Sequence, residues 1–385
     1  MTLSKMQSNS VRIALTSSMA GNVLIDFYLP NQILTSSLKL ASLIFSILCL
    51  NRRIFHNRVQ LDIASFSFFS ILCCLQISAI INNHFFQPNL IVYFFWGIIF
   101  FRVHQIRHLI LLSIKDSIFV LLSLSLVTIV VNYNPQNLSF DTSGYWLPLN
   151  IFLKNDTRQF GVFTHPNTLA QISVFALFFY FYFKENKILL MLSLLGITAS
   201  GSRTYEICYI LLIFLNSLYR NKSFKNRKLE MIFPMFFLLY LLTTLVITLL
   251  SVGFKLSVSD STFTGRGQIW LYVINSLSKN YLFGLGPNYI GTINNLQRIN
   301  SYANSAHSIY LELLVSGGVI SVIFLCILLS KIFLLQLVRL DNSFYLLLVF
   351  LIAGITETIV NFSSFGIANF LFLHLVFTQK SEKIR

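Results

Sequence analysis

The first candidate for chemistry is Arg266, in the stretch TGRGQIW. It lies between Gly265 and Gly267, at the predicted start of an amphipathic helix over residues 267–280. A helix N-terminus presents unpaired N–H groups and partial positive charge, and flanking glycines let an anion approach the backbone. A guanidinium at such a place favours a diphosphate as the ligand. The alternative is an arginine that is simply solvated in a loop.

The second candidate is His307, in the stretch NSAHSIYLELL. Asn304 or Ser305 is expected to cap the helix that follows, which places His307 in the first turn, at the outer membrane surface. A neutral imidazole there can accept a proton from a sugar hydroxyl. Glu312 is not expected on the same helix face, so its predicted role is to orient another member of the site. The alternative is that His307 is a polar interfacial residue.

Two further arginines precede predicted helices. Arg203 lies in the turn TASGSRTYE, at headgroup depth, where charged residues are costly and tend to be functional. Arg158 begins the stretch RQFGVFTHPNTLAQ. In it, Pro166 and Asn167 are expected to break the chain and cap the next helix, which leaves Arg158 and His165 at the outer surface. For Arg203, the alternative is a side chain that simply snorkels to the membrane interface. For the stretch that begins at Arg158, the alternative is an ordinary loop that ends before the next helix.

The elements that must position these residues are transmembrane helices. Of the 385 residues, 55% are hydrophobic and 11% are charged, and the mean hydropathy is +0.72. A soluble protein cannot bury that much apolar surface. We therefore predict an all-α, polytopic integral membrane protein with about twelve transmembrane helices. The five cysteines fall within apolar segments and are interpreted as small hydrophobic side chains.

Two long loops interrupt the apolar segments, over residues 133–168 and 253–308. Long loops in a compact membrane protein usually carry function. The chain is accordingly divided into N-terminal transmembrane helices, 1–132, and a membrane region that includes both loops, 133–385. The predicted spans cover roughly residues 13–29, 33–50, 61–81, 89–101, 117–132, 169–183, 187–200, 204–219, 231–252, 309–330, 343–360 and 364–378.

The distribution of positive charge predicts the topology. The net charge is +15, but the basic residues form clusters between spans, which is typical of membrane topology and not of nucleic-acid binding. With the N-terminus inside, 20 of the 28 Lys and Arg residues lie on the cytoplasmic side and 7 outside. Twelve spans with both termini cytoplasmic therefore satisfy the positive-inside rule. Both long loops are then extracytoplasmic.

No metal or cofactor is expected at the site. The outer loops contain no DxD or HExxH motif and no cluster of histidine and carboxylate residues at metal-ligand spacing. No Walker or dinucleotide-binding motif is present. If the chain is an enzyme, arginine is expected to supply the positive charge that a metal supplies elsewhere.

Six short motifs, in order, resemble the O-antigen ligase and O-antigen polymerase superfamily, as does the predicted twelve-span plan. The resemblance covers roughly residues 155–365. The motifs are GVFTHPNTLA (161–170), SGSRTYE (200–206), TGRGQIW (264–270), YLFGLGPN (281–288), AHSIYLELLVSGGVIS (306–321) and GITETIVNF (354–362).

The resemblance implies inverting glycosyl transfer on the outer face of the membrane, from a glycan on a polyprenyl diphosphate, without metal or nucleotide sugar. The family's arginine in the large outer loop and its histidine at the loop's end correspond to Arg266 and His307. Arg203 and Arg158 are expected to bind the diphosphate together with Arg266. The expected supporting residues are His165, Asn167 and Glu312.

The resemblance leaves the acceptor open. A ligase moves the glycan onto lipid A core, whereas a polymerase moves it onto another lipid-linked repeat unit. We favour the polymerase because both long loops are modest in size. Ser308 departs from the family, which often has Asn after the histidine.

The implied setting is the assembly of a surface polysaccharide, such as O-antigen, capsule or exopolysaccharide, in the inner membrane of a bacterium. The implied partners are the polyprenyl-diphosphate-linked glycan, an acceptor glycolipid and the bilayer. A chain-length regulator and a flippase are candidate protein partners, and nucleic acid is not expected.

Two other classes of function compete with this one. A flippase or exporter of the lipid-linked sugar would not need two long outer loops, and it should carry charged residues deep within several spans. The sequence argues against this class, because the deep candidates are only Asp26, Lys39, Glu206 and Glu357. A non-catalytic scaffold of a polysaccharide assembly complex is the second alternative. The arginines predicted outside the membrane argue against a scaffold.

Overall fold

The computed structural model describes the chain over most of its predicted membrane segments. The described residues are 5–28, 62–82, 88–102, 107–131, 158–163, 165–183, 187–220, 266–277, 280–287, 289, 306–339, 343–358, 360 and 367–377. Within these ranges the regular elements are helices and no strand is present. This agrees with the prediction of an all-α membrane protein.

Ten of the twelve predicted spans coincide with a described helix. The other two, 33–50 and 231–252, lie outside the described residues, as do the proposed division at residue 132 and most of both long loops. The helices are α1 (Lys5–Tyr28), α3 (Ile63–Ile81), α4 (Pro88–Arg102), α5 (Arg107–Val131), α7 (Pro166–Phe183), α8 (Lys187–Ser200), α9 (Arg203–Arg220), α11 (Arg266–Ser276), α14 (Ile309–Arg339), α15 (Ser343–Thr356) and α16 (Ile367–Phe377).

Three helices in the described part are both long and apolar enough to cross a membrane. They are Ile63–Ile81 in α3, His108–Val131 in α5 and Ile309–Gln336 in α14. Shorter apolar helices include Lys187–Ser200 and Ser343–Ile355. These helices support a membrane protein, and the number of twelve spans stays a prediction.

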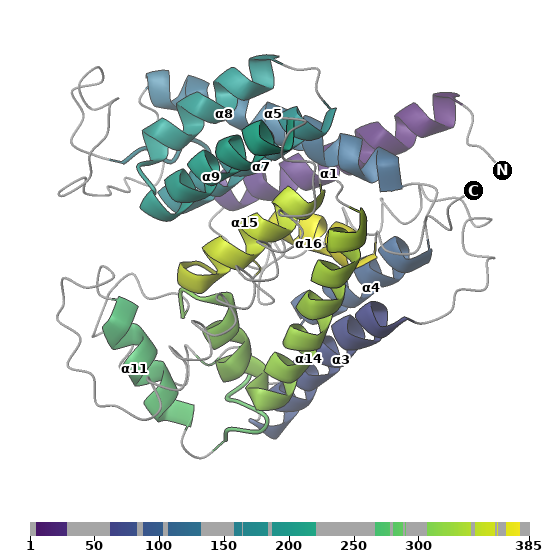
Figure 1. Ribbon diagram of the computed structural model, residues 1–385, viewed down its shortest axis with the longest axis vertical. Coiled ribbons are helices and arrows are strands. Elements are labelled where there is room, and N and C mark those ends of the chain that lie inside the picture. Colours follow the sequence, from purple (N-terminus) through teal and green to yellow (C-terminus); the bar gives the residue numbers. More distant parts are fainter. Residues whose placement is uncertain are drawn as a thin grey trace.

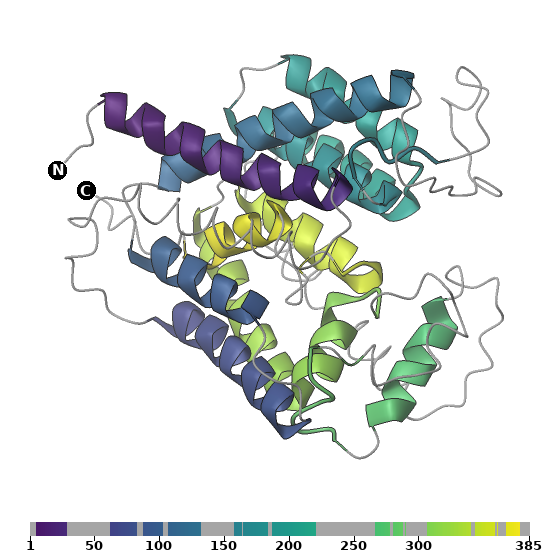
Figure 2. The same cartoon turned by 180° about the vertical axis from the view of Figure 1, so that it is seen from behind.

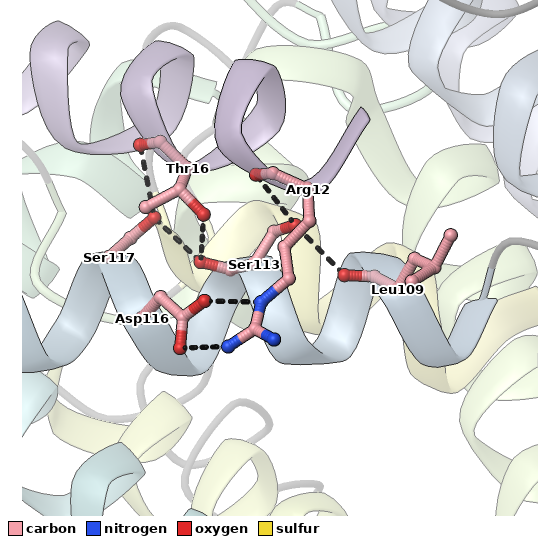
Figure 3. Close-up of polar contacts among 6 residues, drawn as sticks. All are labelled: Arg12, Thr16, Leu109, Ser113, Asp116 and Ser117. Carbon is pink, nitrogen blue, oxygen red and sulfur yellow. Dashed lines mark hydrogen bonds and ion pairs between the residues drawn. The ribbon is translucent and has the colours of Figure 1, made fainter. Parts of the chain in front are cut away.

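A polar seam joins α1 to α5 (Figure 3). Arg12 Nε and Nη2 donate to the two carboxylate oxygens of Asp116, at 2.6 and 2.9 Å. The Ser113 hydroxyl donates to the Arg12 carbonyl, and the Ser117 hydroxyl donates to the Thr16 carbonyl, both at 3.3 Å. Residues four apart in α1 thus meet residues four apart in α5 in the same order, so the two helices run parallel. The predicted topology also requires the first and fifth spans to run in the same direction, because successive spans cross the membrane in alternating directions.

The helices form two groups with α15 and α16 between them (Figures 1 and 2). One group holds α1, α5, α7, α8 and α9, and the other holds α3, α4 and α14. In the second group α3 and α14 run antiparallel, because Phe66 packs against Phe324 while Leu75 lies against Gly317. The helix α16 is buried at every residue, so it belongs to the interior of the bundle.

Exposed apolar side chains line the outside of the first group. On α8 these are Ile188, Met191, Leu194 and Leu195, and on α9 they are Ile207, Ile210, Ile213 and Phe214. So many exposed apolar side chains on two helices are unfavourable in water, and they fit a face turned toward lipid.

The helix α14 is broken at Gly318. This residue has φ 74° and ψ −176°, which are not helical angles. The break leaves backbone groups without helical partners, and a turn from the second long loop supplies one, since the Leu285 N–H donates to the Val315 carbonyl at 2.6 Å. Gly284 also has a positive φ, and a Cβ there would collide with the Val315 carbonyl oxygen. The turn therefore packs directly on the backbone of α14.

Candidate functional site

Arg158 ties the end of the first long loop to the turn between α8 and α9. Its Nε donates to the Ser200 carbonyl at 2.8 Å, and its Nη2 donates to Asn167 Oδ1 at 2.6 Å. The neighbouring Gln159 N–H donates to the Ala199 carbonyl at 3.0 Å. Ser200 lies three residues before Arg203, so the first loop and the N-terminus of α9 are adjacent. Two of the predicted site segments therefore meet.

His165, and not Asn167, caps α7. The His165 carbonyl accepts from the Thr168 N–H at 3.0 Å, and its Nδ1 accepts from the Asn167 N–H at 3.1 Å. Pro166 follows at the first helical position, where its missing N–H costs nothing. The helix begins at Pro166, three residues before the predicted span, so Asn167 lies inside it. The expectation that Asn167 caps the helix is therefore wrong, because the Asn167 N–H is itself capped by the His165 side chain.

The Asn167 side chain instead makes a long-range contact. Its Nδ2 donates to Glu357 Oε1 at 2.9 Å, while its Oδ1 accepts from Arg158. Glu357 directly follows α15 and is buried, at 7% exposure. The structure thus places Arg158, Asn167 and Glu357 in one hydrogen-bonded row, with His165 beside it.

His307 lies before α14 and not in its first turn. The helix begins at Ile309, and the Ser308 carbonyl accepts its first backbone hydrogen bond, from Glu312 at 2.8 Å. His307 has a φ of +49°, a left-handed conformation that residues other than glycine adopt rarely. The predicted place in the first turn is therefore wrong, and the predicted caps Asn304 and Ser305 lie outside the described residues.

Glu312 holds the segment that precedes His307. Its Oε2 accepts from the Tyr289 hydroxyl at 2.6 Å and from the Ala306 N–H at 3.0 Å, and its side chain is 5% exposed. Burial and the nearby Glu312 carboxylate raise the pKa of Tyr289 well above its ordinary value, so the hydroxyl keeps the proton that it donates. Glu312 thus fixes the backbone of the residue next to His307.

The helix α11 joins the same segment through Trp270. The indole Nε1–H donates to the Ala306 carbonyl at 2.8 Å. The predicted amphipathic helix is present, but its apolar side does not lie on the membrane surface as expected. It packs against protein, in a cluster that includes Leu311, Leu314 and Val315 of α14. The buried residues on the α11 side are Ile269, Trp270, Val273, Ile274 and Leu277.

Arg266 and Arg203 are the first residues of α11 and α9 respectively. Both backbones lie at helix N-termini, where the partial charge of the helix favours an anion. Their side chains fall outside the described part of the structure. The backbone places Arg266 one turn before Trp270, and Trp270 in turn contacts the residue before His307.

Two clusters of predicted residues meet at one end of the bundle. The first contains Arg158, His165 and Asn167, and the second contains His307 and Glu312. The Ser308 hydroxyl connects them, because it donates at 3.3 Å to the carbonyl of Gly354, three residues before Glu357. The region around the start of α14 and the end of α15 is therefore the candidate site.

Glu357 belongs to this site although the sequence analysis did not assign it there and named it only as a candidate for a charge deep within a span. It instead directly follows the last residue of α15. The available signals were its place in the motif GITETIVNF and the presence of a carboxylate in an otherwise apolar segment. Its partner Asn167 is 190 positions away in sequence. Among the described residues no group of three or more His, Cys, Asp or Glu is placed to hold a metal ion.

Residues 188–326 match the family model described as O-antigen ligase. The match covers less than half of the chain. It includes Arg203, Arg266, His307 and Glu312, whereas Arg158, His165, Asn167 and Glu357 lie beyond its ends. Searches of curated proteins and of solved structures gave no match.

Proposed function

We propose that this protein, which matches the O-antigen ligase family model over residues 188–326, is a glycosyltransferase of surface polysaccharide assembly. It takes a glycan from a polyprenyl-diphosphate donor and transfers it to a lipid-linked repeat unit, as a polymerase does. The site faces the extracytoplasmic side of the bacterial inner membrane, and both termini are cytoplasmic. A flippase delivers the donor, and a chain-length regulator is a further candidate partner.

One observation carries this proposal. Trp270 of α11 donates to the carbonyl of Ala306, the residue before His307. Because Arg266 lies one turn before Trp270, this contact keeps the backbone of Arg266 close to that of His307. Two residues from opposite ends of a long loop are thereby brought to one place, as a cation and a base acting on the same substrate require.

The proposed reaction breaks one bond and forms another. The acceptor hydroxyl attacks the anomeric carbon of the donor sugar while His307 takes the hydroxyl proton. The bond between that carbon and the diphosphate oxygen breaks, and its electron pair leaves with the polyprenyl diphosphate. Inversion at the anomeric carbon follows from a single displacement.

The arginines have the complementary role of stabilising the departing diphosphate. Arg266, Arg203 and Arg158 are the proposed ligands of its oxygens, since guanidinium groups bind phosphate oxygens in pairs. A preorganised donor of this type contributes about 3–4 kcal/mol to transition-state stabilisation in other enzymes. His307 is the proposed base, and His165, Asn167 and Glu312 support the two clusters.

The local backbone supports the role of His307. A left-handed backbone at a residue other than glycine is strained, and such residues concentrate at functional sites. Here Glu312 accepts from Ala306 on one side of His307, and Ser308 donates to Gly354 on the other. The imidazole is therefore attached to a backbone that is fixed on both sides.

The proposal is tested with a deletion strain that expresses Arg266→Ala or His307→Ala. Both variants should lose long polysaccharide chains on gels, while the protein level in the membrane stays normal. The matched control is His108→Ala, since His108 is exposed on α5 and outside the candidate site. Wild-type amount and chain length in both Arg266→Ala and His307→Ala would overturn the enzyme proposal in favour of a flippase or a scaffold.

Ligation to lipid A core is the second candidate, because the matching family model is described as O-antigen ligase. The deletion strain separates the two acceptors. A polymerase defect leaves single repeat units attached and removes the long chains. A ligase defect leaves polymer on the polyprenyl carrier.

A further inference from the structure

The side chain of Asn82, at the end of α3, uses both its donor nitrogen and its acceptor oxygen on other parts of the protein. Its Nδ2 donates to the Ser78 carbonyl at 2.8 Å and to the Gly284 carbonyl at 3.0 Å. Its Oδ1 accepts from Nδ2 of Asn280 at 3.2 Å. Turning the amide over would set its oxygen against two carbonyls, so its orientation is fixed. The end of α3 is thereby tied to residues that are 198 and 202 positions away in sequence.

The helix end itself gives no reason for an asparagine at this position. Asparagine is favoured where a helix ends in a left-handed residue, but Asn82 has φ −92° and ψ 19°. Its backbone N–H donates to the Ser78 carbonyl at 3.1 Å, which any residue other than proline can do. The contacts with Gly284 and Asn280 do give a reason, because they require a side chain that donates and accepts at once.

The turn that Asn82 holds begins just after α11. The turn is closed by the Gly284 N–H, which donates to the Asn280 carbonyl at 2.7 Å. The Asn280 N–H donates to the carbonyl of Leu277, the residue that follows α11, at 2.9 Å. Arg266 is the first residue of the same helix. Because the hydrogen-bonded backbone of a helix couples its two ends, a shift of the turn also shifts Arg266.

In the other direction the same turn leads to His307. The Gly286 carbonyl accepts from the Tyr289 N–H at 3.1 Å, and the Tyr289 hydroxyl donates to Glu312 at 2.6 Å. Glu312 in turn accepts from the N–H of the residue before His307. The contact at the end of α3 is therefore connected to both of the proposed catalytic residues.

We propose that Asn82 is a positioning residue of the glycosyltransferase, which holds the second long loop against α3 and so sets the place of Arg266 relative to His307. This inference rests on the proposed function. It gives the N-terminal helices, residues 1–132, a part in the site, and Asn82 lies outside the residues that the family model matches.

The variant that tests this role is Asn82→Asp, because it keeps the size of the side chain and its acceptor but removes both donors. The carboxylate then faces the carbonyls of Ser78 and Gly284 with no proton between them. The matched control is Asp62→Ala at the opposite end of α3, where Asp62 Oδ1 caps the helix by accepting from the Ser65 N–H at 2.8 Å. Both variants should lower the thermal midpoint, but only Asn82→Asp should displace the loop.

The first measurement is the distance between two spin labels on the purified full chain in lipid nanodiscs, with its five native cysteines replaced by alanine. One label is placed at Ile77→Cys, exposed on α3, and the other at Asn275→Cys, exposed on α11. We expect one narrow distance distribution in the parent and in Asp62→Ala, and a shifted or broader one in Asn82→Asp. The same distribution in Asn82→Asp as in the parent would overturn the inference.

The second measurement is the Kd for undecaprenyl diphosphate, the leaving group of the proposed donor, at a temperature well below all thermal midpoints. Asn82→Asp should raise Kd by roughly 10-fold, and Asp62→Ala by less than about 3-fold. If both raise Kd equally, Asn82 acts through stability alone and the inference is overturned. If Arg266→Ala raises Kd but Asn82→Asp does not, the inference alone fails. If Arg266→Ala binds as tightly as the wild type, the proposed diphosphate role of Arg266 fails, and the spin-label distances still decide whether Asn82 holds the loop.

Discussion

The Val319 N–H donates to the Tyr281 carbonyl oxygen at 2.9 Å, directly after the break in α14. The turn that contains Tyr281 thus occupies the place of the missing helical turn. Backbone groups inside a membrane protein need an internal partner when no water is available. The second long loop is therefore anchored on α14, the helix that begins just after His307. We expect a substitution at the break in α14 to disturb the candidate site.

Gly318→Ala tests this anchor. Gly318 has a positive φ, and a Cβ there would collide with the backbone of Leu282 and Phe283. We expect a loss of at least about 2–3 kcal/mol in stability and loss of polysaccharide in cells. Thermal unfolding of the purified protein measures the first effect.

The matched control for that change is Gly21→Ala in α1, where a Cβ meets nothing within 4 Å. This substitution should leave stability equal or raise it by roughly 0.5–1 kcal/mol, because alanine favours a helix more than glycine does. Equal behaviour of the two alanine variants would show that the break at Gly318 has no structural importance.

Glu312→Ala should abolish transfer while Glu312→Gln retains much of it. The alanine leaves the Tyr289 hydroxyl and the Ala306 N–H buried without an acceptor, at roughly 1–3 kcal/mol each. The glutamine carbonyl can still accept from both. The measurements are the thermal midpoint and the amount of polysaccharide on gels. A glutamine variant as inactive as the alanine variant would point to the charge of Glu312 and not to its hydrogen bonds.

Tyr289 should make stability depend on pH only in the alkaline range. Its pKa is raised by burial and by Glu312, so its stabilising effect is fully present below the ordinary value of about 10 and is lost as the pH rises through the raised value. Tyr289→Phe removes this group. The difference in thermal midpoint between wild type and variant should therefore be constant near neutral pH and shrink at high pH. A difference that changes between pH 6 and 8 would exclude Tyr289 as its source.

Trp270→Phe should reduce transfer without unfolding the protein. The phenyl ring keeps most of the packing against α14, but the hydrogen bond to Ala306 is lost, at a cost of about 0.5–1.5 kcal/mol. We expect several-fold less polymer at equal protein level. Asn275→Ala on the exposed side of α11 is the control and should behave as wild type. Unchanged polymer in Trp270→Phe would mean that this contact does not position the site.

The topology is tested by labelling with a membrane-impermeant maleimide. Asn275→Cys should react in cells whose inner membrane is intact, because α11 is expected outside. Asn9→Cys, exposed near the start of α1, should react only after lysis. The parental protein, with its exposed Cys73 and Cys326, gives the background. Labelling of the two positions in the reverse order would place the site on the cytoplasmic side and remove the proposed function.

Local patterns predicted the helices and failed at contacts that are distant in sequence. Apolar runs located ten of the predicted spans, and the spacing of Ile269, Val273 and Leu277 located α11. The same spacing could not distinguish packing on a lipid surface from packing on protein, because an apolar stripe along one helix face is stable in contact with either. The partner of that stripe is α14, which lies beyond a long intervening loop.

The sequence predicted most of the residues of the candidate site but not how they are arranged in space. Its members were visible because few arginine and histidine residues fall in the segments that are predicted to be extracytoplasmic. The place of His307 was wrong, since a helix start depends on which carbonyl accepts first and that is Ser308. Glu357 was not assigned to the site because a single acidic residue in an apolar segment does not indicate its partner. Its contact with Asn167 is visible only in the folded structure.

The parallel pairing of α1 with α5 also sets an order of events during synthesis. The residues that meet across the seam are 101 positions apart. At translation speeds of roughly 5–20 residues per second, roughly 5–20 s pass between the emergence of one and of the other. During that interval Arg12 cannot form its ion pair, because Asp116 has not yet been synthesised.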